Sequence, residues 1–145
     1  MSENENMKSK LFFIFFVLSF CFISCYDDKN FVGDWEIVSL KKDDVYQTIA
    51  VSDLKVINKD GKFFVAGNSG VNLFNGQIKN KAKDKIIIEN LASTRMMGSP
   101  QAMEFENLFL ETLTGTVNIN IQDDILTLTN PEKKLELKFK RQTKK

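Results

Sequence analysis

The sequence of 145 residues contains no histidine and only two cysteines, and its charges nearly cancel. Without histidine, the chain can form no Ser-His-Asp triad, no Cys-His dyad and no histidine-ligated zinc site. The 20 Lys and Arg residues balance 19 Asp and Glu residues, so a net charge of +1 gives no electrostatic reason to expect nucleic-acid binding. The length is that of one domain. We therefore predict a single non-catalytic domain with no metal ion, no cofactor and no nucleic-acid partner.

One apolar run stands apart from the rest of the chain. Residues 11–23 are apolar almost throughout and follow Lys8 and Lys10. The run is shorter than the about 20 residues that a membrane-spanning helix needs. A basic stretch followed by a short apolar stretch is typical of a secretory signal peptide. The sequence therefore predicts a signal peptide over residues 1–24.

The apolar run ends at Phe22-Ile23-Ser24-Cys25, where polar residues begin. An apolar residue, a small residue and then cysteine resemble the lipobox of bacterial lipoproteins, whose cysteine is diacylated and becomes the first residue after cleavage. We therefore predict lipidation of Cys25, with residues 25–30 as a short tether. Two acyl chains make stable anchoring plausible where one chain is marginal. The alternative is an ordinary signal peptide with an incidental cysteine.

This interpretation accounts for both cysteines. Cys21 leaves with the signal peptide, and lipid blocks the sulfur of Cys25. The mature chain then has no free thiol and no disulfide, although its compartment would permit one. We expect a membrane-anchored lipoprotein of the bacterial cell envelope, on the periplasmic or the surface face. Its stability must come from packing, and the remaining chain is long enough for one core.

Most of the mature chain is predicted to form short strands. Asp60-Gly61 lies between apolar runs and predicts a hairpin. Asn75-Gly76 interrupts its own run and predicts a turn or a bulge. The β-branched residues 86–88 suit a strand buried on both faces or a barrel wall. Apolar and polar residues alternate after residue 116, which predicts a three-strand antiparallel meander. The predicted strands cover residues 31–40, 54–57, 63–65, 71–79, 85–90, 117–121, 126–129 and 135–140.

One helix is predicted from about Pro100 to Thr114. Ser99 suits the N-cap, because its hydroxyl can accept from the free amides, and Pro100 presets φ for the first helical position. Gly115 follows as a helix terminator. At 100° per residue, one face of the helix is apolar. That face comprises Ala102, Phe105, Phe109 and Leu113.

Glu106 falls inside this apolar face. A carboxylate there should be paired or protonated. Arg95, just upstream of the helix, is the nearest candidate partner in sequence, so one hypothesis is an Arg95–Glu106 ion pair that pins the loop to the helix. The alternative is that Glu106 simply lies at the edge of the apolar stripe.

Three stretches of the chain resemble the META domain, which occurs in HslJ-like heat-shock proteins and related bacterial lipoproteins. They are residues 70–76, residues 91–97 with their Ala-Ser-Thr-Arg-Met sequence, and residues 103–106 with Phe109 and Leu113 of the predicted helix. The matching positions are Gly70, Asn72, Phe74, Gly76, Ala92, Ser93, Thr94, Arg95, Met96, Met103, Glu104, Glu106 and Phe109. The resemblance assigns residues 31–141 to a META-like domain and leaves residues 142–145 as a basic tail.

The resemblance implies a mainly β (α+β) fold, an antiparallel barrel-like sheet of about seven or eight strands with one helix packed on it. It also implies envelope localisation and a link to stress or drug tolerance, without established catalytic chemistry. The family often has cysteines at two positions that are Val71 and Gly98 here. Any disulfide or thiol role attached to those positions is therefore absent from this chain.

Other polar and sulfur-containing groups have both a functional and a structural explanation. Residues 93–95, Ser-Thr-Arg, could place a nucleophile beside a cation, but hydroxyls before a helix more often bond to the backbone. Met96, Met97 and Met103 could line a soft-metal or apolar site, although core filling is the default. The C-terminal segment is basic and could contact anionic lipid or polymer, but a solvated chain end is the simpler explanation. This segment comprises Lys138, Lys140, Arg141, Lys144 and Lys145.

Two interpretations of function remain. In the first, the chain is a non-catalytic envelope lipoprotein, a monomer anchored to the membrane through Cys25, that acts as an interaction or stress-associated module with an envelope protein as partner. In the second, the barrel binds a small apolar ligand, because small barrels either fill with side chains or keep a cavity. Large residues favour filling, and they are Trp35, Phe63, Phe64, Phe74 and Phe139.

Overall fold

The computed structural model describes residues 30–143, apart from the side chains at positions 80 and 81. The predicted signal peptide, Cys25 and most of the predicted tether lie outside the described residues, as does the end of the basic tail. Within the described part, no helix is long and apolar enough to cross a membrane.

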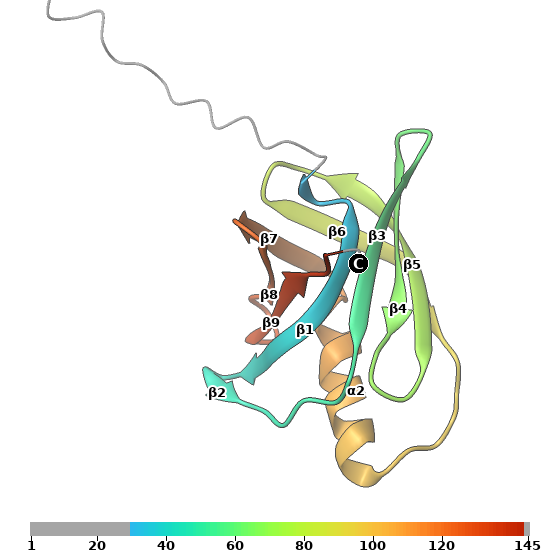
Figure 1. The fold of residues 1–145 in the computed structure, drawn as a ribbon, viewed down its shortest axis with the longest axis vertical. Helices are drawn as coiled ribbons and strands as arrows, with labels where there is room; N and C mark the ends of the chain where they lie inside the picture. The colour runs from blue at the N-terminus through green and yellow to red at the C-terminus, as the bar shows by residue number, and fades with distance from the viewer. Residues whose placement is uncertain (1–29, 144–145) are drawn as a thin grey trace, which may run out of the picture.

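The described residues form nine antiparallel strands and one α-helix (Figure 1). The helix, α2 (Pro100–Thr112), lies between β6 and β7 in the sequence. The strands are β1 (Gly33–Lys42), β2 (Val45–Tyr46), β3 (Asp53–Lys59), β4 (Lys62–Asn68), β5 (Leu73–Lys81), β6 (Lys85–Ser93), β7 (Thr116–Gln122), β8 (Ile125–Asn130) and β9 (Leu135–Arg141).

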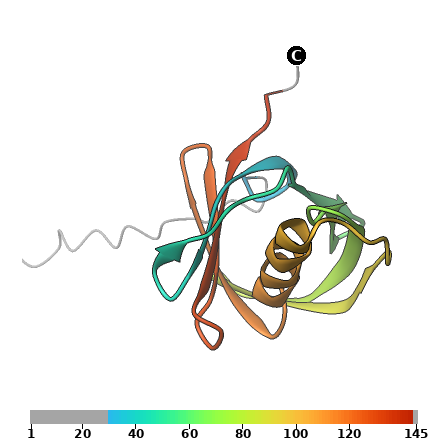
Figure 2. The ribbon, with the colours of Figure 1, turned by 90° about the horizontal axis from the view of Figure 1, so that it is seen from below.

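Eight of these strands close into a barrel. Each strand from β3 to β9 pairs with its neighbour in the sequence, and β1 pairs with both β3 and β9. The two-residue β2 extends β1 outside the ring. Seen from below, α2 lies inside the ring of strands (Figure 2). The prediction of a mainly β, barrel-like antiparallel sheet with one packed helix is therefore confirmed.

The local sequence signals formed the expected turns. Asp60 and Gly61 both have positive φ, 53° and 79°, and join β3 to β4. The register of β5 against β6 shifts between Asn75 and Gln77, so Asn75-Gly76 is a bulge rather than a turn. The predicted meander is the hairpin series β7, β8 and β9. On β6, alternate residues face the core, as a barrel wall requires.

The barrel interior is filled by side chains. Phe109 of α2 lies in the middle, with its ring centroid 5.4 Å from that of Phe74, 5.9 Å from Phe105 and 6.0 Å from Phe139. Trp35 is fully buried, and its indole N–H donates to the carbonyl of Phe31 at 3.1 Å. Because α2 projects its apolar face into the ring, the helix completes the core of the barrel.

The ends of α2 follow the predicted chemistry, with one difference. Ser99 is the N-cap, and its hydroxyl accepts from the backbone N–H of Ala102 at 3.3 Å. The helix ends at Thr112, two residues before the predicted end, because a tertiary contact caps it. The side-chain amide of Asn130, on β8, donates to the carbonyls of Glu111 at 3.2 Å and Thr114 at 2.7 Å. These bonds satisfy carbonyls that another helical turn would have used.

Candidate functional site

The three stretches that resemble the META domain meet around one buried carboxylate. The loop between β4 and β5, the segment between β6 and α2, and the second turn of α2 come together at one end of the barrel. We call Ser69, Asn72, Thr94 and Glu106 the carboxylate cluster. Residues separated by up to 37 positions in the sequence are thus hydrogen-bonded to one another.

Glu106 is the centre of this cluster, and its side chain is only 4% exposed. Its Oε2 accepts from the backbone N–H groups of Val71 at 3.1 Å and Asn72 at 2.7 Å. The Ser69 hydroxyl lies 2.8 Å from the same oxygen. The side-chain amide of Asn72 donates to Oε1 at 2.7 Å. The buried charge is therefore stabilised by neutral donors rather than by a cation.

The hypothesis of an Arg95–Glu106 ion pair is wrong. Arg95 is exposed, and no ion pair joins it to Glu106 or to another carboxylate among residues 30–143. The physical reason is that a tight loop aims two backbone amides and the Asn72 side chain at the carboxylate. These donors are already desolvated and fixed, so a flexible arginine is not needed. The alternative fits the position of Glu106, which lies at one edge of the buried face of α2, although the residue is buried and hydrogen-bonded there.

Asn72 links the three segments, and all of its side-chain hydrogen-bonding atoms are used. Its Oδ1 accepts from the Thr94 hydroxyl at 2.9 Å and from the backbone N–H of Met96 at 2.6 Å. Its Nδ2 donates to the Met96 carbonyl at 3.1 Å as well as to Glu106. A fully satisfied amide of this kind rigidifies a site. The cluster therefore fixes the segment before α2 against the loop between β4 and β5.

Two opposing effects set the pKa of Glu106. Burial raises the pKa, but hydrogen bonds from Asn72, Ser69 and Val71 to the ionised form outweigh it and leave the pKa below its ordinary value. The group is therefore an anion at neutral pH. Three donors contact Oε2, and the Asn72 side-chain amide contacts Oε1.

The other residues of the resemblance fall into two groups. Phe74 and Phe109 belong to the core, and Gly70 and Gly76 leave space that Phe105 and Ile88 occupy. An added Cβ would lie 2.9 Å from Phe105 at Gly70 and 2.7 Å from Ile88 at Gly76. The remaining residues lie outside the buried centre of the cluster. Met103 is half-buried, and the exposed ones are Ala92, Ser93, Arg95, Met96 and Glu104.

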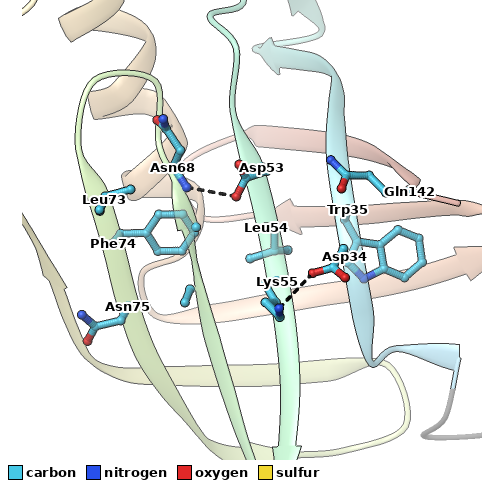
Figure 3. Close-up of a pocket in the computed structure, with 12 residues that line it drawn as sticks. Asp34, Trp35, Asp53, Leu54, Lys55, Asn68, Leu73, Phe74, Asn75 and Gln142 are labelled. Atoms are coloured by element: carbon cyan, nitrogen blue, oxygen red, sulfur yellow. Dashed lines mark hydrogen bonds and ion pairs between the residues drawn. The ribbon is translucent and has the colours of Figure 1, made fainter. Parts of the chain in front are cut away.

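A second candidate site is a hollow of about 620 Å³ on the outer wall of the barrel (Figure 3). It spans β1, β3, β4 and β5 and is rimmed by polar side chains. Asp34 pairs with Lys55 at 3.4 Å, and the Asp53 carboxylate accepts from the backbone N–H of Asn68 at 3.2 Å. Asn75 completes this polar rim. Sequence reasoning missed the hollow, because its residues come from five separate segments without a shared motif.

The hollow offers carboxylate, amide and ammonium groups, which suit hydrogen bonding to a polar molecule. Gly67 lies in its wall, where an added Cβ would come within 2.3 Å of the Asp53 carbonyl oxygen. Within residues 30–143, no three carboxylates or thiolates lie close enough together to hold a metal ion. The hollow is therefore a candidate for binding a polar molecule through hydrogen bonds.

The family model of the META domain matches residues 29–144. The chain belongs to the META domain family. An NMR structure of a protein from Burkholderia xenovorans is 21% identical to it, with 77% of this chain and 83% of that chain covered and a TM-score of 0.63. Another protein solved by NMR is 22% identical, with 75% and 88% covered and a TM-score of 0.54. No curated protein matches significantly. At these identities, the two structures show a similar fold and nothing more.

Proposed function

We propose that this META-domain protein is a membrane-anchored lipoprotein of the bacterial cell envelope and a non-catalytic interaction module, with an envelope protein as partner and a stress-associated role. The lipobox at Cys25 supports the anchor. The carboxylate cluster supports a non-catalytic role, because its acidic group is fully hydrogen-bonded and its hydroxyl groups bond to neighbouring segments. The stress-associated role rests on the resemblance to HslJ-like proteins.

The observation that carries the interaction role is a set of exposed apolar side chains on segments that contact the loop between β4 and β5. Met96 is hydrogen-bonded to Asn72 of this loop, and Ala50 would lie 3.4 Å from a Cβ added to Gly70. We call Ile49, Val51, Met96 and Met97 the apolar rim. Val51 is 89% exposed and Met97 is 94% exposed, and the other two are also exposed. Exposed apolar groups gathered on one surface mark interaction sites. Methionine suits such a surface, because its flexible, polarisable side chain adapts to a partner.

The rim is held in place by the cluster beneath it. Asn72 bonds to both backbone groups of Met96. An added Cβ on Gly98 would lie 2.5 Å from a methyl of Val71, so the two loops are in close contact. The buried polar network therefore positions an apolar surface, and this gives Glu106 a structural role that supports binding.

Anchoring and interaction are tested together in the native host. We expect Cys25→Ser to abolish lipid labelling and to leave the chain unprocessed or outside the membrane fraction. A photo-crosslinking residue at Met97 is expected to give one discrete adduct with an envelope protein. The same residue at Asn120, exposed on β7, is the matched control and should give none.

Unchanged lipid labelling and membrane content in the Cys25→Ser variant would contradict the anchor. Equal crosslinking from Met97 and Asn120, or none from either, would contradict the interaction surface.

A second candidate function is the binding of a small molecule. Aromatic rings pack around Phe109 in the interior, so the hollow of Figure 3 is the place that supports this function. Native mass spectrometry of the protein from its own host tests it. A stoichiometric extra mass that disappears on denaturation would support a ligand, and a bare monomer mass would count against one.

A further inference from the structure

The antiparallel order of the strands places five features at one end of the barrel. β1 begins at this end, and the β3–β4, β5–β6 and β7–β8 turns return to it. β9 also ends there, because Arg141 pairs with Trp35 near the start of β1. Figure 1 shows the β3–β4 and β5–β6 turns at the top and α2 at the bottom. The start of the domain therefore lies opposite the apolar rim.

Arg141 fixes the point where the chain enters the domain. Its guanidinium donates to the carbonyls of Asn30 and Val32. Its Cζ lies 4.1 Å from the ring centroid of Trp35, and its Nε lies 3.6 Å from the Asp124 carboxylate. An arginine held by two carbonyls, an aromatic face and a carboxylate has little freedom. Residue 30 is thus fastened to the barrel at this end.

Exposed lysines surround this entry point. They have no ion-pair partner among the described residues, although Asp60, Asp84 and Asp123 lie at the same end. The lysines outnumber these carboxylates. We call this group the lysine end, and it comprises Lys59, Lys62, Lys83, Lys85 and Lys140.

At the opposite end, cations and carboxylates are nearly balanced, since Lys42, Arg95 and Lys133 are exposed there too. There Lys41 pairs with Glu136 at 3.8 Å and Lys134 pairs with Asp43 at 3.6 Å. Further carboxylates come from α2, where Glu104 and Glu111 are exposed. The excess of exposed lysines without an ion-pair partner is therefore found at the lysine end.

We propose that the lysine end lies on an anionic lipid surface and so orients the domain, with the apolar rim pointing away from the membrane. The inference rests on the proposed anchor at Cys25. Residues 25–30 span about 20 Å at full extension, so the lysine end must stay close to the anchored leaflet. Attraction between lysines and anionic lipids acts within a Debye length of about 8 Å at physiological salt. The short tether therefore keeps the lysines close to the lipid headgroups.

The orientation is measured on the full lipidated chain in vesicles of phosphatidylcholine, with or without phosphatidylglycerol. A thiol placed by Lys83→Cys reports on the lysine end, and one placed by Met97→Cys reports on the opposite end. We expect phosphatidylglycerol to slow the reaction of Lys83→Cys with a membrane-impermeant maleimide about threefold or more, and high salt to reverse this. The Met97→Cys rate should not change.

Two triple charge variants test whether the lysines of the lysine end cause the slowing. Lys59→Glu, Lys62→Glu and Lys85→Glu in the Lys83→Cys background should remove the slowing. The matched control carries Lys42→Glu, Arg95→Glu and Lys133→Glu, at exposed positions of the opposite end, and should keep it.

Equal rates with and without phosphatidylglycerol, or equal slowing at both thiols, would overturn the orientation. Slowing by soluble polyphosphate but not by phosphatidylglycerol would assign the lysine end to a polyanion and also overturn it. A chain that fails to float with neutral vesicles would instead contradict the anchor. In that case, flotation with anionic vesicles that is lost in the Lys-to-Glu variant would still support lipid binding by the lysines. Flotation that persists in this variant, or no flotation at all, would contradict it.

Discussion

Replacing Glu106 with alanine is expected to lower the free energy of unfolding by about 3–5 kcal/mol, close to the largest effects of single substitutions. The variant removes the acceptor for the buried backbone amides of Val71 and Asn72. It also removes one acceptor each from the Asn72 side chain and the Ser69 hydroxyl, which keep their bonds to the carbonyls of Met96 and Asn72. Each unsatisfied buried donor costs about 1–3 kcal/mol. Urea denaturation followed by tryptophan fluorescence measures the change, since Trp35 is the only tryptophan and lies in the core.

The matched control is Glu104→Ala, two positions earlier on the exposed side of α2. It should change the stability by less than about 0.5 kcal/mol. Glu106→Gln keeps the size of the side chain but turns an NH₂ group toward amide donors, so we expect a loss of about 2 kcal/mol. If Glu106→Ala and Glu104→Ala were equally stable, the structural role of the cluster would be contradicted.

The pH dependence of stability gives a second signature of Glu106. Its pKa is lowered in the folded protein, so the folded state favours the ionised form more than the unfolded state does. This contribution is fully present above the unfolded pKa of about 4.3 and is lost as the pH falls through the folded pKa. Stability in the wild type should therefore fall more steeply below about pH 4 than in Glu106→Gln. Parallel curves would contradict the assigned pKa shift.

A disulfide between positions 71 and 98 is expected to stabilise the protein by roughly 3–4 kcal/mol and to raise Tm by about 10 °C. A Cβ on Gly98 would lie 3.4 Å from the Cβ of Val71, close to the Cβ separation of disulfides. The Val71→Cys, Gly98→Cys double variant would close a loop that spans β5 and β6, and a long loop gives a large entropic effect. Calorimetry of the oxidised and reduced forms measures the difference.

The single variants Val71→Cys and Gly98→Cys are the controls and should gain nothing on oxidation. The reduced double variant should be somewhat less stable than the wild type, because the methyl groups of Val71 fill the space beside Gly98. Free thiols that persist under oxidising conditions, or an oxidised form no more stable than the reduced one, would contradict the geometry. This chain has no cysteine at either position, and hydrogen bonds from Asn72 and Leu73 join the two segments instead.

Much of the local structure could be predicted from the sequence. Alternating apolar residues determined the strands of the meander, and Asp60-Gly61 determined a hairpin because its backbone needs positive φ at both positions. Ser99 and Pro100 determined where α2 begins, since helix starts depend on neighbouring residues. The family motifs also predicted a barrel with one helix. These features could be predicted because each depends on residues that are close in the sequence.

Only the tertiary structure decided which distant groups meet. The partner of Glu106 could not be found from the nearest cation, because the donors lie 34 to 37 residues upstream in a loop without charge. The closure of β1 against β9, the cap of α2 by Asn130 and the outer hollow likewise join distant segments. Periodicity specifies which face of a strand is buried, whereas the pairing of distant strands and loops depends on packing in three dimensions. The sequence by itself therefore determined the family and most of the elements, though not the short β2, and the fold determined what the polar motif residues contact.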